Sequence, residues 1–321
     1  MKDEVIADVD DGNEFVRIED IAEGAQQPRR ADSSTENGYH PRNLRWPWLT
    51  SSVVSTLDSD WRGSLAYTVV RLRNGAVERV FEYGDVSAVR PWASVSKMAV
   101  AMAFGVEMDW GLHTYSEMVG PRGANFANLF SHSSGLGLEE SDPVVPVGTK
   151  RVYSNYGVDY AVAKIVGGNP AAEWLDDRVF SPLGMRSSAL LGRPAAGVSG
   201  STEDMEKLAI AWLRPDALAA PTRDRMIRPY LPELAGIVPG FGRFTPCPWG
   251  MGPEIRGDKS HWMGDWLATS FGHFGMSGSL MLLNVDEGIG VVATTTEDFG
   301  PWAVALWPAW TSAVRSIALD S

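Results

Sequence analysis

Hydrophobic and polar residues alternate in segments near both ends of the chain, a pattern typical of β-strands with one buried face. The first two such segments span residues 64–72 and 76–83, and Asn74-Gly75 lies between them. This dipeptide favours a tight hairpin turn because its residues tolerate positive φ angles. Residues 279–294 repeat the arrangement near the C-terminus, with a turn at Asp286-Glu287-Gly288. The sequence therefore predicts two antiparallel hairpins.

Apolar residues at helical spacing dominate the middle of the chain and its end. Helices are predicted over residues 95–104, 158–166, 202–214 and 302–317. Gly167-Gly168 ends the second of these helices, because glycine is favoured just after a helix C-terminus. Residues 236–272 are rich in Gly, Pro and Trp, and we expect long ordered loops there.

This order of elements predicts an α+β fold with one antiparallel sheet flanked by helices. Both ends of the chain contribute strands to the sheet, and a helical lobe is inserted between them. We expect the α/β lobe to comprise about residues 44–90 and 255–321. The mainly helical lobe would then span about residues 91–254.

The beginning of the chain is strongly acidic. Residues 1–42 contain 11 Asp and Glu against 5 Lys and Arg, a net charge of −6 out of −12 for the whole chain. Few large apolar residues interrupt this composition, which predicts that residues 1–43 form a flexible tail. No basic patch occurs in the remainder, so no nucleic-acid partner is expected.

Composition also bears on where the protein acts. No run of about 18 apolar residues occurs, so no membrane-spanning helix is expected. The N-terminus lacks the apolar core of a secretory signal, and Cys247 is the only cysteine. These features predict a cytoplasmic protein without an intrachain disulfide.

A serine and a lysine stand at the start of the helix predicted over residues 95–104. In Ser94-Val95-Ser96-Lys97 the amine lies one helical turn beyond the Ser94 hydroxyl, on the same face. A serine hydroxyl needs a nearby base to act as a nucleophile, and burial lowers the pKa of a lysine amine. We therefore interpret Ser94 and Lys97 as a catalytic pair.

Further motifs follow in a recognisable order. They are Leu129-Phe130-Ser131-His132-Ser133-Ser134-Gly135-Leu136, Tyr153-Ser154-Asn155 and His273-Phe274-Gly275. With the Ser94 motif they resemble the serine β-lactamase and penicillin-binding protein superfamily, and in particular class C β-lactamases and their esterase relatives. The resemblance covers about residues 45–318 and implies a β-lactamase/transpeptidase-like fold.

The resemblance also implies a role for each matching residue. Ser94 would form an acyl-enzyme, and the N–H groups of Ser94 and Met276 would form the oxyanion hole. Lys97 would lie close to the Tyr153 phenol and lower its pKa, which leaves open whether Tyr153, Lys97 or the pair is the base. Asn155 would orient Lys97 or bind the acyl side chain of the substrate. His132 is expected to brace the helical lobe.

The third motif departs from the Lys-Thr-Gly of the superfamily. His273, Phe274 and Gly275 lack both the permanent charge of the lysine and the threonine hydroxyl. A substrate carboxylate would lose about 1–3 kcal/mol for each missing partner. We therefore expect these substrate-binding residues to favour a neutral ester or amide over a carboxylate-bearing β-lactam.

Tryptophans are abundant, and several lie in the loop region before the third motif. Trp249, Trp262 and Trp266 are candidates for lining the acyl pocket. The chain contains no His-Glu-x-x-His, no paired cysteines and no phosphate-binding glycine loop, so no metal or cofactor is expected.

These observations favour a serine hydrolase, and most strongly a carboxylesterase acting on small or medium acyl esters. A β-lactamase or D-amino-acid peptidase is the nearest alternative, although it conflicts with Phe274. A module that binds a ligand without hydrolysing it is a third hypothesis. The sequence leaves the oligomeric state open.

Overall fold

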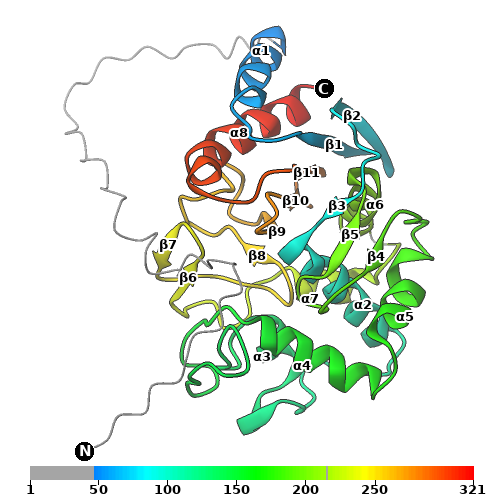
Figure 1. Ribbon diagram of the computed structural model, residues 1–321, viewed down its shortest axis with the longest axis vertical. Helices are drawn as coiled ribbons and strands as arrows, with labels where there is room; N and C mark the ends of the chain where they lie inside the picture. The colour runs from blue at the N-terminus through cyan, green and yellow to red at the C-terminus, as the bar shows by residue number, and fades with distance from the viewer. Residues whose placement is uncertain (1–46, 215) are drawn as a thin grey trace, which may run out of the picture. The chain divides into compact units, whose positions relative to one another are not determined.

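The two predicted hairpins contribute four strands to a six-stranded antiparallel sheet. The computed structural model describes residues 47–214 and 216–321. The hairpin strands are β1 (Ala66–Arg73), β2 (Ala76–Tyr83), β10 (Leu280–Asn284) and β11 (Ile289–Thr294), and β8 (Glu254–Ile255) and β9 (Phe271–Phe274) complete the sheet. The strand order is β2-β1-β11-β10-β9-β8, so both ends of the described chain meet in one sheet, as predicted (Figure 1).

Turn chemistry and register explain how the ends of the chain come together. Asn74 and Gly75 both have positive φ angles, 51° and 79°, which suits the two-residue turn between β1 and β2. β1 then pairs with β11 along its length, from Ala66 opposite Thr294 to Arg71 opposite Ile289. The most distant strands in the sequence are therefore neighbours.

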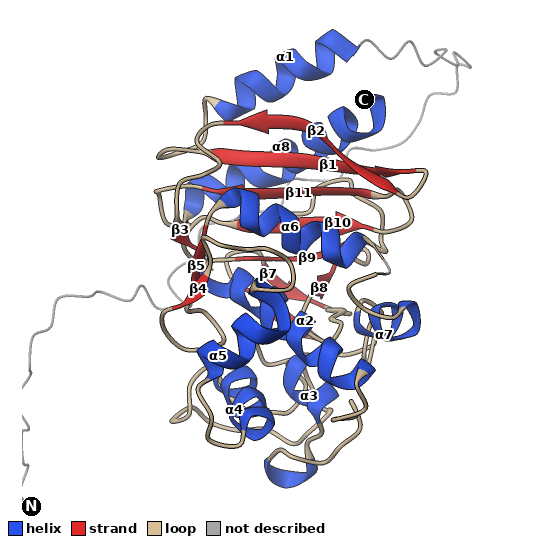
Figure 2. Cartoon of the chain, turned by 90° about the vertical axis from the view of Figure 1, so that its right-hand side faces the viewer, coloured by secondary structure: helices blue, strands red, loops and turns tan. Residues whose placement is uncertain are grey.

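Helices cover both faces of the sheet. α8 (Pro301–Asp320) packs against α1 (Pro47–Asp58) and against β11 and β1, and α6 (Thr202–Leu213) packs against the same strands from the other side. Figure 2 shows α6 in front of the strands and α8 behind them. α6 comes from the segment expected in the helical lobe, yet it lies on the sheet.

A second group of helices lies beyond the β8 edge of the sheet, in the lower half of Figure 2. Its helices are α2 (Ser96–Asp109), α3 (Phe126–Phe130), α4 (Asn155–Val166), α5 (Ala171–Leu175) and α7 (Ala220–Met226). The segments before, between and after these helices contain the 3-10 helices η2 (Ala93–Val95) and η3 (Pro121–Gly123) and the π-helix η4 (Asp176–Phe180). They also contain the short strands β3 (Arg90–Pro91), β4 (Ala189–Leu190), β5 (Val198–Gly200), β6 (Gly236–Val238) and β7 (Gly242–Phe244). α2 is buried along almost its whole length and is the centre of this group.

The predicted helices and hairpins are present among the described residues, whereas one prediction of loops is wrong in part. The region 236–272 contains β6, β7, β8 and the beginning of β9, so the prediction of loops throughout it is wrong in part. The acidic tail predicted over residues 1–43 lies outside the described residues. Within the described residues, the structure contains no helix with the length and apolar character needed to span a membrane.

Candidate active site

Ser94 lies in the short turn η2, directly before α2. The preceding residue, Ala93, has a φ of 43°, a left-handed conformation that is strained for a residue with a Cβ atom. This bend positions Ser94 at the N-terminal end of α2, where the helix dipole favours developing negative charge. The strain is located where a nucleophile is expected.

The Ser94 hydroxyl is held between two side chains. The Tyr153 hydroxyl donates a hydrogen bond to Ser94 Oγ over 2.8 Å, and Lys97 Nζ lies 3.1 Å from the same oxygen. Lys97 Nζ also lies 4.8 Å from the centroid of the Tyr153 ring. The three residues that the sequence assigned to catalysis are therefore in mutual contact.

Lys97 is almost fully buried, with 1% of its surface exposed. Burial lowers the pKa of its amine to about 7, with a smaller opposing effect from the negative charge of Asp159. Lys97 Nζ has two further neighbours, Asn155 Oδ1 at 2.7 Å and the Ala195 carbonyl oxygen at 2.9 Å. A substantial fraction of this amine is therefore neutral near pH 7, as a general base must be.

Tyr153 differs from the expectation. Burial raises the pKa of its phenol above the ordinary value, and the hydrogen bond to Ser94 opposes this effect only in part. A cationic neighbour would lower this pKa, but the Lys97 amine loses its charge near neutral pH and provides little such stabilisation. The phenol is therefore protonated and suited to donate a proton.

The turn before α4 positions both Tyr153 and Asn155. Ser154 Oγ caps the helix by accepting a hydrogen bond from the Gly157 N–H over 2.8 Å. His132 Nδ1 accepts the Ser154 N–H over 3.1 Å, and the His132 ring packs against Tyr153 with centroids 4.6 Å apart. These contacts support the bracing role expected of His132.

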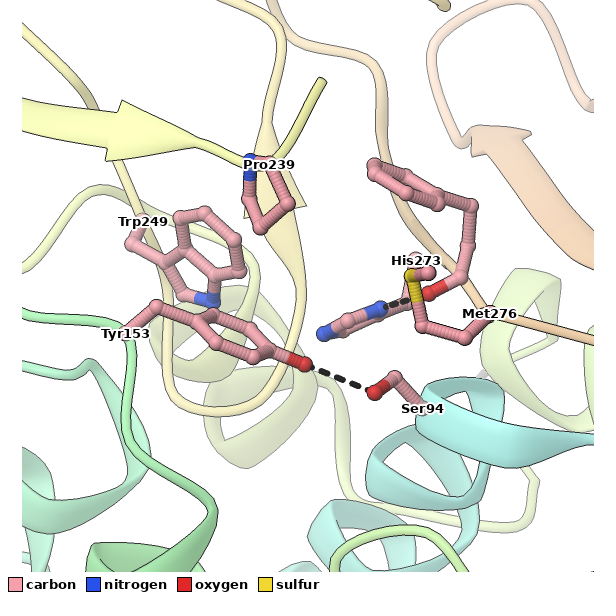
Figure 3. A pocket seen from close by; sticks show the side chains of 7 residues that line it. Ser94, Tyr153, Pro239, Trp249, His273 and Met276 are labelled. Carbon is pink, nitrogen blue, oxygen red and sulfur yellow. Dashed lines mark hydrogen bonds between the residues drawn. The ribbon is translucent and has the colours of Figure 1, made fainter. Parts of the chain in front are cut away.

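Ser94 opens onto a small apolar cavity of about 40 Å³. It is lined by Ser94, Tyr153, Pro239, Trp249, His273, Phe274 and Met276. Figure 3 shows Tyr153 and Trp249 on one side of the space and Ser94 and Met276 on the other, with the His273 ring between them. The volume accommodates a few water molecules or a short acyl group.

His273 presents a hydrogen-bond acceptor to this cavity. Its Nδ1 donates to the Phe274 carbonyl oxygen over 2.7 Å, so its Nε2 carries the lone pair, and this Nε2 has no partner among the described residues. Burial, followed by the neighbouring Lys97, lowers the pKa of His273 to about 3. The residue is neutral, as expected, and provides no cation for a carboxylate.

Gly275 allows the third motif to approach the nucleophile. A Cβ atom at this position would lie 2.4 Å from the Trp92 carbonyl oxygen and 3.0 Å from the Ala93 Cβ. Gly275 does not itself line the cavity, whereas its neighbours Phe274 and Met276 do. The end of β9 therefore packs directly against the segment that carries Ser94.

Two of the three tryptophans predicted to line the pocket do not reach it. Trp262 is fully buried and packs behind Phe274, with centroids 5.6 Å apart, and Trp266 donates its N–H to the Thr311 carbonyl oxygen of α8. Only Trp249 lines the cavity. The prediction is wrong for Trp262 and Trp266 because their hydrogen bonds orient them into the core.

A buried charged cluster lies behind this wall. Glu254 contacts Lys259 Nζ at 2.5 Å, His261 Nε2 at 2.9 Å and Trp262 Nε1 at 2.8 Å. Burial raises the pKa of the Glu254 carboxyl, but the charge of Lys259 and the contacts with His261 outweigh it, so the pKa falls well below its ordinary value. Lys259 Nζ also lies 5.7 Å from the centroid of the Trp249 ring, which connects the cluster to the cavity wall.

Sequence reasoning missed Pro239 and Ala195. Pro239 lies between β6 and β7 and lines the cavity, while Ala195 contributes only a backbone carbonyl. Neither residue type carries a chemical signal in a single sequence. Both contacts depend on how distant loops fold over Ser94.

Comparison with known proteins agrees with this geometry. The profile of a protein family described as Beta-lactamase matches residues 57–314. A β-lactamase from Mycobacterium bovis is 32% identical, with a TM-score of 0.78 over 83% of this chain and 99% of that chain. A comparison with curated proteins gives no significant match.

Two more distant structures share the fold. A β-lactamase/D-alanine carboxypeptidase from Yersinia pestis is 16% identical, with a TM-score of 0.62 over 85% of this chain and 98% of that chain. EstCE1, a hydrolase with promiscuous acyltransferase activity, is 14% identical, with a TM-score of 0.66 over 85% of this chain and 99% of that chain. With the family match over most of its length, the chain belongs to the Beta-lactamase family and is a serine hydrolase of that fold.

Proposed function

We propose that the protein is a carboxylesterase that hydrolyses neutral esters of short acyl groups through an acyl-enzyme on Ser94. The observation that carries the proposal is the placement of Ser94 Oγ between the Lys97 amine and the Tyr153 hydroxyl, at the edge of a small apolar cavity. No residue that lines this cavity carries a permanent charge.

In the acylation step, Lys97 Nζ accepts the Ser94 hydroxyl proton while Oγ attacks the ester carbonyl carbon. The N–H groups of Ser94 and Met276 are proposed to stabilise the oxyanion of the tetrahedral intermediate. Collapse of this intermediate breaks the bond between the carbonyl carbon and the leaving alkoxide, which takes a proton from Tyr153. The Tyr153 phenolate then recovers the proton carried by Lys97, and water repeats the sequence to release the acid.

A β-lactamase is the second candidate, because the relative from Mycobacterium bovis bears that name at 32% identity. The cavity opposes this assignment, since the neutral His273 and the apolar Phe274 provide no partner for a carboxylate. A D-amino-acid peptidase would face the same difficulty with its anionic product.

The predicted cytoplasmic location remains a prediction and agrees with the single, buried Cys247.

Turnover of two substrate classes tests the proposal. Wild type and Ser94→Ala are compared on p-nitrophenyl acetate and on a chromogenic cephalosporin. We expect ester turnover that depends on Ser94 and little cephalosporin cleavage. Rapid cephalosporin cleavage would instead establish a β-lactamase, and ligand binding that Ser94→Ala leaves intact, with no turnover of either substrate, would favour a binding module.

A further inference from the structure

The Lys97 amine has three oxygen neighbours, and two of them can only accept a hydrogen bond. Asn155 Oδ1 and the Ala195 carbonyl oxygen are acceptors, whereas the Ser94 hydroxyl can also donate. A neutral amine has two N–H groups and one lone pair. If the two N–H groups are directed to Asn155 and Ala195, the lone pair faces the Ser94 proton.

Glu139 determines which atom of the Asn155 amide faces Lys97. The Asn155 Nδ2 group donates to Glu139 Oε1 over 3.4 Å, and an ionised carboxylate can only accept. The opposite amide orientation would place Oδ1 against this carboxylate and Nδ2 against the amine. Glu139 therefore favours the orientation in which Oδ1 accepts from Lys97.

Arg193 connects Glu139 to the second acceptor. Its Nη1 donates to Glu139 Oε1 and Oε2 over 2.8 and 2.6 Å, and its Nε donates to Asp159 Oδ2 over 2.6 Å. The other Asp159 oxygen accepts the Ala195 N–H over 2.8 Å. The contacts form a closed ring that runs from Lys97 through Asn155, Glu139, Arg193, Asp159 and Ala195 back to Lys97.

The location of this ring argues against a purely stabilising role. The Arg193 and Glu139 side chains are 38% and 44% exposed, and exposed ion pairs contribute only about 0–1 kcal/mol to stability. The ring instead joins three separate segments around one buried amine. Asn155 and Asp159 lie one turn apart on α4, Glu139 precedes that helix, and Arg193 and Ala195 lie between β4 and β5.

We propose that Glu139, Arg193 and Asp159 are positioning residues that direct the Lys97 lone pair toward Ser94 by fixing the Asn155 amide and the Ala195 carbonyl. This inference rests on the proposed role of Lys97 as the base. The three residues do not touch the reacting atoms, so their effect reaches the reaction through Lys97.

The charges of the ring give the proposal an electrostatic signature. Asp159 and Glu139 raise the pKa of Lys97, whereas Arg193 lowers it. The other titratable groups that face Lys97 are His132, His273 and Tyr153, and burial holds all three in their neutral forms. Removing an acidic member and removing the basic member should therefore shift the pKa of Lys97 in opposite directions.

Two measurements on the same variants test the proposal. The variants are Glu139→Gln, Asp159→Asn and Arg193→Gln, with Glu140→Gln as the matched control. Glu140 is the exposed neighbour of Glu139, but its carboxylate contacts the Tyr156 hydroxyl at 3.2 Å and lies outside the ring. The first measurement is the dependence of kcat for p-nitrophenyl acetate on pH, and the second is an NMR titration of isotope-labelled lysine.

Lysines are few in the chain, and Lys97→Met identifies the Lys97 signal. We expect its pKa to fall by roughly half a unit in Glu139→Gln and Asp159→Asn and to rise by a similar amount in Arg193→Gln. The maximal kcat should fall about 10-fold in each of the three, because the lone pair is misdirected. Glu140→Gln should change neither quantity.

The outcomes separate this inference from the proposed function. If the Lys97 pKa shifts with the expected signs but the protein has no esterase activity, the three residues still act on Lys97, and only the assigned reaction is contradicted. An unchanged Lys97 pKa and kcat in all three variants would overturn the inference. A loss of thermal stability with unchanged kcat would show that the ring is merely structural, which also contradicts it.

Discussion

The Tyr153 hydroxyl donates a hydrogen bond to Ser94 Oγ over 2.8 Å, although the two residues are 59 positions apart in the chain. The Lys97 amine lies on the other side of the same oxygen. Burial lowers the pKa of this amine to about 7. A protonated phenol and a partly neutral amine therefore share one nucleophile. This division favours Lys97 as the base and Tyr153 as the proton donor.

Tyr153→Phe isolates the contribution of the phenol. The ring contacts with His132 and Trp249 are retained, so we expect thermal stability close to that of wild type. The maximal kcat should fall by about 10²–10⁴-fold, the range for loss of a general acid. Tyr156→Phe, which removes a hydroxyl bound to the exposed Glu140, is the control. Equal activity of both variants would exclude Tyr153 as the proton donor.

The pH dependence of kcat/KM reports on Lys97. The neutral amine is the active form, so kcat/KM should rise with pH and level off above a midpoint near the amine pKa of about 7. Initial rates on p-nitrophenyl acetate at constant ionic strength measure this midpoint. A midpoint close to 10 would show that the amine remains charged, and would contradict its role as the base.

Lys97 also makes stability depend on pH. Its pKa is about 7 in the folded state against an ordinary value of 10.5, so the unfolded chain binds more protons between these values. The contribution of Lys97 to the free energy of unfolding therefore rises as the pH increases from about 7 to 10.5. Urea unfolding at both ends of this window should show a smaller increase for Lys97→Met than for wild type. Equal increases would mean that the amine is not perturbed.

The size of the cavity predicts a preference for short acyl chains. Pro239, Trp249, Phe274 and Met276 enclose about 40 Å³ next to Ser94, and Met276 is 53% exposed at its edge. We expect kcat/KM to decrease from p-nitrophenyl acetate to the octanoate. Met276→Ala should open this edge and raise the ratio of kcat/KM for the octanoate to kcat/KM for the acetate. The variant keeps the backbone N–H proposed for the oxyanion hole. A ratio that stays the same would show that acyl groups bind elsewhere.

The buried pair of Glu254 and Lys259 predicts a large effect on stability. Lys259→Met leaves the Glu254 carboxylate buried without its nearest cation, which costs about 3–5 kcal/mol. In the double variant with Glu254→Gln no buried charge remains in this pair, so the loss should be smaller than in Lys259→Met. Urea unfolding measures both values. A double variant less stable than Lys259→Met would contradict this explanation.

Local signals in the sequence predicted much of the fold. Asn74-Gly75 identified the first hairpin because positive φ angles are costly for most other residues. Gly167 ends α4 in a left-handed conformation, as predicted, whereas the helix begins at Asn155 rather than at Val158 because Ser154 caps it there. Such features depend on a few neighbouring residues, so a single sequence contains them.

Only those parts of the site whose side chains form a recognisable chemical pattern could be predicted from the sequence. Ser94, Lys97 and Tyr153 form a recognisable pattern, whereas Trp262 and Trp266 had the right residue type and the wrong orientation. The Ala195 carbonyl and the salt bridges of Arg193 depend on the path of a loop between β4 and β5. The raised pKa of Tyr153 follows from burial, which residue spacing does not report.

The most direct test of Ser94 as the nucleophile is to trap the acyl-enzyme. Wild type and Ser94→Ala are mixed with p-nitrophenyl acetate, quenched with acid and examined by intact-mass spectrometry and peptide mapping. We predict one added acetyl group in wild type, located on the peptide that contains Ser94, and none in Ser94→Ala. An acetyl group on another residue, or ester turnover that persists in Ser94→Ala, would contradict the mechanism.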